Sequence, residues 1–134
     1  MDLKKKILII EDDKDIRNFL ARRMNGSGFQ AFTAEDGLTG LEMAKRELPD
    51  VIILDLRLPN LSGEEVCKTI REDRDNRFAG IPIIMLTAKT ADADRVVGRV
   101  IGASCYMTKP FRARQLIEQV QKFAQERVDG HVDF

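Results

Sequence analysis

The sequence has few of the residues from which many enzymes build a reactive site. Its 134 residues include one histidine and two cysteines. Cys67 and Cys105 form no C-x-x-C pair, so neither a zinc site nor a disulfide framework is indicated, and a reduced, cytoplasmic setting is expected. His131 lies near the end of the sequence and is interpreted as incidental. Because this is the only histidine, no Ser/His/Asp or Cys/His catalytic set can be assembled.

An excess of charge of one sign and long apolar runs are also missing. Lys and Arg together number 22, as do Asp and Glu. This balance argues against direct nucleic-acid binding driven by bulk charge and against a polybasic membrane patch. The longest apolar runs are too short to span a bilayer, and the run Ile7–Ile10 meets three acids directly, which argues against a signal peptide. The remaining composition, 43% hydrophobic and 33% charged, is typical of one soluble globular domain.

Short runs rich in β-branched residues alternate with amphipathic segments along the chain. The runs predict strands at Lys6–Glu11, Phe29–Ala34, Asp50–Asp55, Ile81–Leu86 and Ser104–Thr108. Between them, apolar residues at three- and four-residue steps predict helices. The residues of the predicted apolar faces are Ile16, Phe19, Leu20 and Met24; Leu38, Leu41, Ala44 and Leu48; Val66 and Ile70; Val96, Val97, Val100 and Ile101; and Leu116, Ile117, Val120, Phe123 and Ala124.

Strand and helix alternate five times, which predicts a single α/β domain. Parallel strands need crossover connections, and these place helices on both faces, so a doubly wound, five-stranded parallel sheet is expected. We expect the domain to span residues 1–128 and residues 129–134 to form a C-terminal tail. With the strand order 2-1-3-4-5, the carboxyl ends of all strands but the second surround one crevice, where such sheets bind ligands.

Polar residues follow the four strands that meet at this crevice. They are Glu11, Asp12 and Asp13 after the first strand, Asp55 at the end of the third, Thr87 after the fourth and Lys109 after the fifth. Taken singly, each residue has an ordinary structural interpretation. Acids before a helix cap its N-terminus, and an aspartate at a strand end can begin a turn. A single threonine at a strand end or a single lysine is usually a solvated surface residue. Capping is favoured for Asp13.

The coincidence of these residues favours a chemical role. Two carboxylates ~4 Å apart repel by ~1 kcal/mol in water and by ~4 kcal/mol at an effective dielectric constant of 20, so a cluster needs a cation. Oxygen ligands suit Mg²⁺ or Mn²⁺, and Lys109 and Thr87 offer a charge and a hydroxyl donor to a phosphoryl group. Asp55 is then a candidate carboxylate nucleophile that forms a phosphoaspartate.

Four motifs in order carry a resemblance to a known family. They are "ILIIEDD", "DVIILDLRLPNLSG", "PIIMLTAK" and "YMTKPF". From Lys5 to about Arg127 the sequence closely resembles the receiver domains of two-component response regulators. The resemblance implies a flavodoxin-like (βα)5 fold, similar to that of chemotaxis regulators, and a role in bacterial-type signalling.

The resemblance implies a role for each residue of the crevice. Asp55 would accept a phosphoryl group from the phosphohistidine of a sensor histidine kinase or a histidine phosphotransfer protein. Mg²⁺ would be held by the carboxylates of Glu11, Asp12 and Asp55 and by the backbone carbonyl of Arg57. The phosphoryl group would be held by Thr87, Lys109 and the Ala88 backbone N–H, and the Lys109–Pro110 bond is expected to be cis.

The resemblance also implies a switch. Thr87 would move towards the phosphoryl group and Tyr106 would rotate inward, changing the face from about Thr90 to Arg127. That face would regulate a downstream effector or a fused output domain, so the chain would act in signalling and not as an enzyme on other substrates. A monomer is expected, with pairing on phosphorylation left open. Receivers joined to winged-helix DNA-binding domains usually carry two acids where this chain has Ser104 and Cys105, which weakens the case for their dimer mode.

Three other functions fit parts of the pattern. A flavin mononucleotide carrier shares the predicted topology, but Glu11, Asp12 and Asp13 would repel the flavin phosphate. A haloacid-dehalogenase-type phosphatase has a second aspartate two residues after the nucleophile, where this chain has Arg57. A phosphorylation-independent interaction module with a receiver fold remains an alternative, although every expected site residue is retained.

Overall fold

A computed structural model describes residues 3–88 and 102–130, with the side chains of all of these except 88 and 127–130. Within these residues, five parallel strands form one sheet in the order β2-β1-β3-β4-β5, which confirms the predicted topology. The elements are β1 (Lys6–Ile10), α1 (Lys14–Gly26), β2 (Gln30–Ala34), α2 (Gly37–Glu47), β3 (Val51–Asp55), α3 (Gly63–Arg71), α4 (Asn76–Ala79), β4 (Ile83–Ala88), β5 (Cys105–Lys109) and α6 (Ala113–Gly130).

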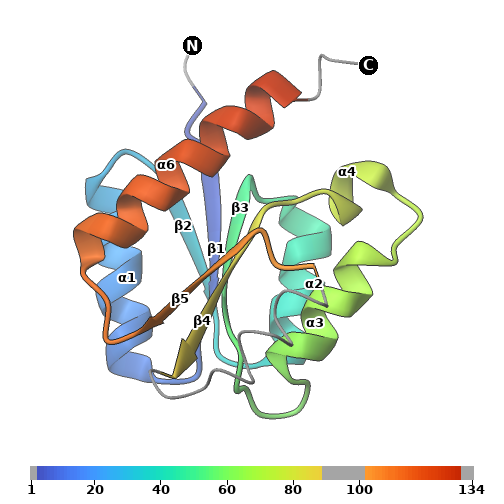
Figure 1. The fold of residues 1–134 in the computed structure, drawn as a ribbon, viewed down its shortest axis with the longest axis horizontal. Helices are drawn as coiled ribbons and strands as arrows, with labels where there is room; N and C mark the ends of the chain where they lie inside the picture. Colours follow the sequence, from blue (N-terminus) through green and yellow to red (C-terminus); the bar gives the residue numbers. More distant parts are fainter. Residues whose placement is uncertain (1–2, 89–101, 131–134) are drawn as a thin grey trace.

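Helices cover both faces of the sheet. Figure 1 shows α1 and α6 on one face and α2 and α3 on the other. Alternate residues of the central strands pack into the two layers, so that Ile7 and Ile53 face α1 and α6 while Leu8 and Ile52 face α2 and α3. Burial on both faces explains why the central strands contain uninterrupted apolar runs at Ile7–Ile10, Val51–Leu54 and Ile83–Leu86.

Two large residues of the predicted apolar faces are exposed instead. Phe19 of α1 and Leu38 of α2 expose 46% and 52% of their surface. On α2 the buried face consists of Gly37, Gly40 and Ala44. A Cβ at Gly40 would lie 2.6 Å from the Ile10 side chain, so this helix approaches the sheet too closely for large side chains. The predicted apolar faces of α1 and α2 are therefore buried only in part, and Phe19 and Leu38 lie at their exposed side.

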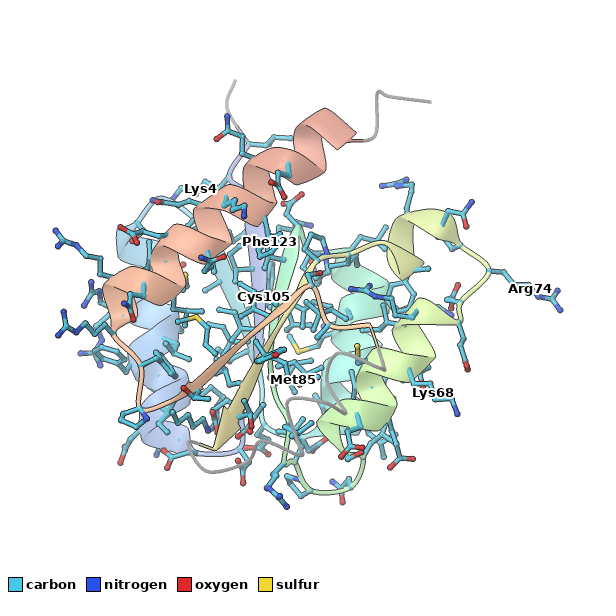
Figure 2. The ribbon with its side chains drawn as sticks, in the orientation of Figure 1. Lys4, Lys68, Arg74, Met85, Cys105 and Phe123 are labelled. Carbon is cyan, nitrogen blue, oxygen red and sulfur yellow. The ribbon has the colours of Figure 1, made fainter. Side chains whose placement is uncertain are left out.

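The long connection between α3 and β4 is packed against the domain. It contains the short helix α4, whose Phe78 is 1% exposed within the core on the α2 and α3 side. Arg74, earlier in the connection, projects away from the molecule (Figure 2). Lys45 of α2 pairs with Asp73 at 2.9 Å. Through Phe78, this connection therefore contributes to the core.

Arg71, the last residue of α3, ties this connection to the start of β5. Its guanidinium donates to the backbone oxygens of Ala79 at 2.7 Å, Ile81 at 2.8 Å and Gly102 at 2.8 Å. Three bonds from one charged group to backbone carbonyls fix the turn that leads into β5.

Some predicted features lie outside the described residues. They include the helix around Val96–Ile101 and His131. Helix α6 continues through Gly130, two residues past Val128, and residues 131–134 of the expected tail are not described. Among the helices that are described, none is apolar over a stretch long enough to cross a bilayer.

Candidate functional site

The carboxyl ends of four strands bring the predicted polar residues to one edge of the sheet. Glu11 directly follows β1, and Asp55 is the last residue of β3. Thr87 follows the residue that pairs with Asp55, and Lys109 of β5 pairs with Ala88. Among the described residues, the buried polar or charged side chains are Glu11 (1% exposed), Asp55 (6%) and Thr87 (2%), and all three lie at this edge.

Lys109 joins the two buried carboxylates. Its Nζ lies 3.1 Å from Glu11 Oε1 and 3.1 Å from Asp55 Oδ2. Burial alone would lower the pKa of Lys109, but the charge of Asp55 and the bonds to both acids outweigh it and leave that pKa raised. The other oxygen of Asp55, Oδ1, accepts the backbone N–H of Arg57 at 3.2 Å. Lys109 is thus held as a cation beside Asp55.

Glu11 shows that one lysine does not neutralise the cluster. The pKa of its carboxyl group is raised from 4.5 to about 7, chiefly by burial and also by the neighbouring charge of Asp55. The Asp13 N–H, which donates to Glu11 Oε2 at 3.1 Å, and the contact with Lys109 lower this pKa without outweighing burial. The site therefore favours additional positive charge.

The acids can hold a divalent cation. Carboxylate oxygens of Glu11, Asp12 and Asp55 lie within 4.8 Å of one another. An all-oxygen set that is partly open to solvent, through the exposed Asp12, suits a hard cation that keeps several waters, such as Mg²⁺. Asp13 lies outside the set, because its Oδ1 caps α1 by accepting the Ile16 N–H at 3.0 Å, as predicted.

A cavity of about 440 Å³ opens beside Asp12. The loop between β3 and α3 and the first turn of α3 supply its other walls, including Arg57, Ser62 and Glu64. Ser62 caps α3 by accepting the Glu65 N–H at 3.2 Å, which fixes the far end of this loop. The cavity is thus bordered by Asp12 on one side and by Leu56 and Arg57, the two residues after Asp55, on another.

The other predicted residues are placed as follows. Tyr106 on β5 is half-buried and packs against the core on the α2 and α3 side. The Lys109–Pro110 bond is cis, which confirms that expectation. Burial raises the pKa of the Cys67 and Cys105 thiols, so neither is activated as a nucleophile.

One residue of the site was missed from the sequence. Arg17 of α1 donates from Nη1 to the backbone oxygens of Glu11 at 2.9 Å and of Asp12 at 3.2 Å. Only its place in the first turns of the helix after the acids could have indicated this contact.

Comparisons with known proteins agree with the geometry. A family model described as "Response regulator receiver domain" matches residues 7–121. The chain is 42% identical over 119 residues to the alkaline phosphatase synthesis transcriptional regulatory protein PhoP of Bacillus subtilis, covering 89% of this chain and 48% of that protein. It is 40% identical over 121 residues to the probable transcriptional regulator ycf27 of Guillardia theta, covering 90% and 46%. The chain thus spans about half the length of these curated relatives.

Solved structures are similar over nearly their whole length. The chemotaxis response regulator CheY4 of Vibrio cholerae matches with a TM-score of 0.81 and 30% identity, over 90% of this chain and 99% of that one. The receiver domain of the Pseudomonas aeruginosa sensor histidine kinase PA1611 matches with a TM-score of 0.83 and 28% identity, over 92% and 99%. The latter structure has a magnesium ion coordinated in its active-site cleft.

Proposed function

Because this chain belongs to the response regulator receiver domains of two-component signalling, we propose that Asp55 is its phosphoacceptor. The phosphoryl donor is a phosphohistidine on a sensor histidine kinase or on a histidine phosphotransfer protein. An oxygen of Asp55 forms a bond to phosphorus while the bond from phosphorus to the imidazole nitrogen breaks, and its electron pair returns to the ring. The observation that carries this proposal is the Asp55 carboxylate at the end of β3, 3.1 Å from Lys109 and grouped with Glu11 and Asp12.

Residues around Asp55 would bind the metal ion that this reaction requires. The carboxylates of Glu11, Asp12 and Asp55 and the backbone carbonyl of Arg57 would hold Mg²⁺ or Mn²⁺. When bound, this cation supplies positive charge to the phosphoryl oxygens. The magnesium ion in the similar PA1611 receiver supports this choice of metal.

The strands beside β3 would stabilise the transferred group. The Lys109 ammonium lies close enough to Asp55 to neutralise a phosphoryl oxygen there. Thr87 would donate its hydroxyl, and the Ala88 backbone N–H would donate alongside it. These contacts position the group and balance its charge, which is most of what phosphoryl transfer requires of a protein.

The output is proposed to arise at the far side of β5. Thr87 moves towards the phosphoryl group, Tyr106 rotates inward, and the face from about Thr90 to Arg127 changes shape. Residues 90–101 of this face lie outside the described part of the chain. In the part that is described, β5 and α6 line a cavity of about 420 Å³ that includes Tyr106 and Gln119. An effector protein or a fused output domain would read this face.

Phosphorylation of the purified protein tests the proposed function. With Mg²⁺ and a small phosphodonor, the intact mass should rise by one phosphoryl group. Removal of the metal with a chelator should abolish the increase, because the clustered carboxylates then repel the incoming phosphoryl oxygens. An unchanged mass in the presence of Mg²⁺ would count against the proposal.

Mg²⁺ affinity should increase as the pH rises from 6 to 8. The pKa of Glu11 is about 7 in the metal-free protein, so at pH 6 its proton must leave before the carboxylate binds a cation. The ionised fraction, and with it the affinity, should grow about tenfold over this range. By the same linkage, the metal-free protein should lose stability as the pH rises through 7, because the folded state holds this proton more tightly than the unfolded state.

Isothermal titration calorimetry at several pH values measures this effect. Glu11→Gln is the matched variant, since it keeps the shape of the side chain and removes the titrating group. It should bind Mg²⁺ more weakly at pH 8 and show a flatter pH dependence. If the Mg²⁺ affinity of this variant depends on pH as steeply as that of the wild type, the proton that is released on Mg²⁺ binding belongs to another residue.

A further inference from the structure

Arg17 links helix α1 to the backbone of the acidic loop. The loop consists of Glu11, Asp12 and Asp13, which lie between the end of β1 and the start of α1. One nitrogen of Arg17, Nη1, donates to the backbone oxygens of Glu11 and Asp12, at 2.9 and 3.2 Å. Its side chain is 13% exposed; the bond to the Glu11 oxygen is partly buried, and the bond to the Asp12 oxygen is exposed. The second nitrogen, Nη2, lies 3.8 Å from Glu35 Oε2, but Glu35 is 72% exposed and this pair contributes little.

Both ends of this contact are held in place. Asp13 caps α1, and that cap fixes where the helix begins and hence where Arg17 lies. On the other side, the Glu11 N–H donates to the Ala34 backbone oxygen at 3.0 Å, which joins the loop to the end of β2. The guanidinium therefore connects two fixed parts of the domain through the loop.

The two carbonyls that Arg17 contacts determine where the Asp12 carboxylate points. The Glu11 carbonyl belongs to the peptide plane before the Asp12 Cα, and the Asp12 carbonyl belongs to the plane after it. Holding both planes fixes φ and ψ of Asp12, and with them the direction of its Cβ. Asp12 is exposed, so packing around the side chain does little to set this direction. The side chains of Glu11 and Asp55, in contrast, are buried, so the packing around them sets their direction.

We propose that Arg17 is a positioning residue of the metal site, which it serves by holding the backbone of Glu11 and Asp12 so that their carboxylates meet Asp55. This inference rests on the proposed function, because it assumes that these acids bind a divalent cation. Groups that orient metal ligands commonly change metal affinity by about 10–100-fold when removed. Charge-assisted bonds from a guanidinium to two carbonyls are strong enough to act in this way.

The sign of the effect separates positioning from simple electrostatics. Arg17 is a cation close to a cation site, so its charge alone opposes Mg²⁺ binding. If charge were its only influence, replacing it with a neutral residue would strengthen Mg²⁺ binding. If it positions the ligands, the same replacement weakens binding.

Calorimetric titration of the full chain with Mg²⁺ tests the inference. Arg17→Gln should bind Mg²⁺ about tenfold more weakly than the wild type. Arg17→Lys keeps the charge but not the planar guanidinium, so it should also bind weakly. Arg22→Gln makes the same charge change at an exposed position of the same helix and should stay within about twofold of the wild type.

Each outcome bears on a definite claim. Binding by Arg17→Gln that equals or exceeds the wild type, or full recovery in Arg17→Lys, overturns the positioning role. Absence of Mg²⁺ binding by the wild type overturns the proposed metal site itself, and the inference with it. Thermal unfolding checks that each variant is folded at the titration temperature; if Arg17→Gln is not, Arg17→Lys decides the question.

Discussion

Replacing Asp55 with asparagine should reduce phosphorylation of the protein to background. Asparagine keeps the size of the side chain, but its amide oxygen is a far weaker nucleophile than a carboxylate oxygen. The change should not unfold the domain, because the charge of Asp55 is one of the causes that raise the pKa of Glu11. Removing that charge relieves repulsion inside a buried cluster. Intact-mass measurement after incubation with Mg²⁺ and a small phosphodonor reports the result.

Asp13→Asn is the matched control. It makes the same chemical change two residues from Glu11, but at a side chain that caps α1. Asparagine caps helices about as well as aspartate, so both stability and phosphorylation should be retained. Undiminished phosphorylation of Asp55→Asn would place the phosphoacceptor elsewhere, whereas loss in both variants would point to a general defect of the acidic loop.

The sheet could be predicted from the sequence because its strands are covered on both faces. Such strands carry continuous apolar runs, as in Ile7–Ile10, whereas a strand with one solvated face commonly alternates apolar and polar residues. The buried faces of the helices were harder to predict, because which residues are buried depends on how closely each helix approaches the sheet. At α2 the contact is made by Gly37, Gly40 and Ala44, residues that a search for large apolar side chains passes over. The apolar face predicted for this helix therefore included Leu38, which is exposed.

The residues of the site were predictable for a topological reason. Parallel strands end at one edge, so residues far apart in sequence, such as Asp55 and Lys109, can be expected to meet once the strand order is assumed. The raised pKa of Glu11 and the contacts of Arg17 could not be predicted in this way. Both depend on burial and on distances of a few ångströms between elements, which no spacing in the sequence encodes.

Gly63→Ala should destabilise the protein strongly, by about 3 kcal/mol. Gly63 begins α3 and donates its N–H to the Leu56 backbone oxygen at 2.9 Å. A Cβ at this position would collide with the backbone oxygen of Asp55 and lie 2.8 Å from the Leu56 Cα. Backbone atoms cannot rotate aside as a side chain can, so the loop or the end of β3 must move. The clash thus lies directly behind the proposed phosphoacceptor, and urea unfolding measures its cost.

Gly26→Ala is the matched control, because the same substitution at this position should not lower the stability of the protein. Gly26 ends α1, and a Cβ there would have no atom within 4 Å. Alanine in a helix without a clash is favoured over glycine by up to about 1 kcal/mol, so this variant should be as stable as the wild type or slightly more so. If Gly63→Ala unfolds at the same urea concentration as Gly26→Ala, the path of the chain beneath Asp55 tolerates a side chain, and the close packing of α3 against the end of β3 is not required.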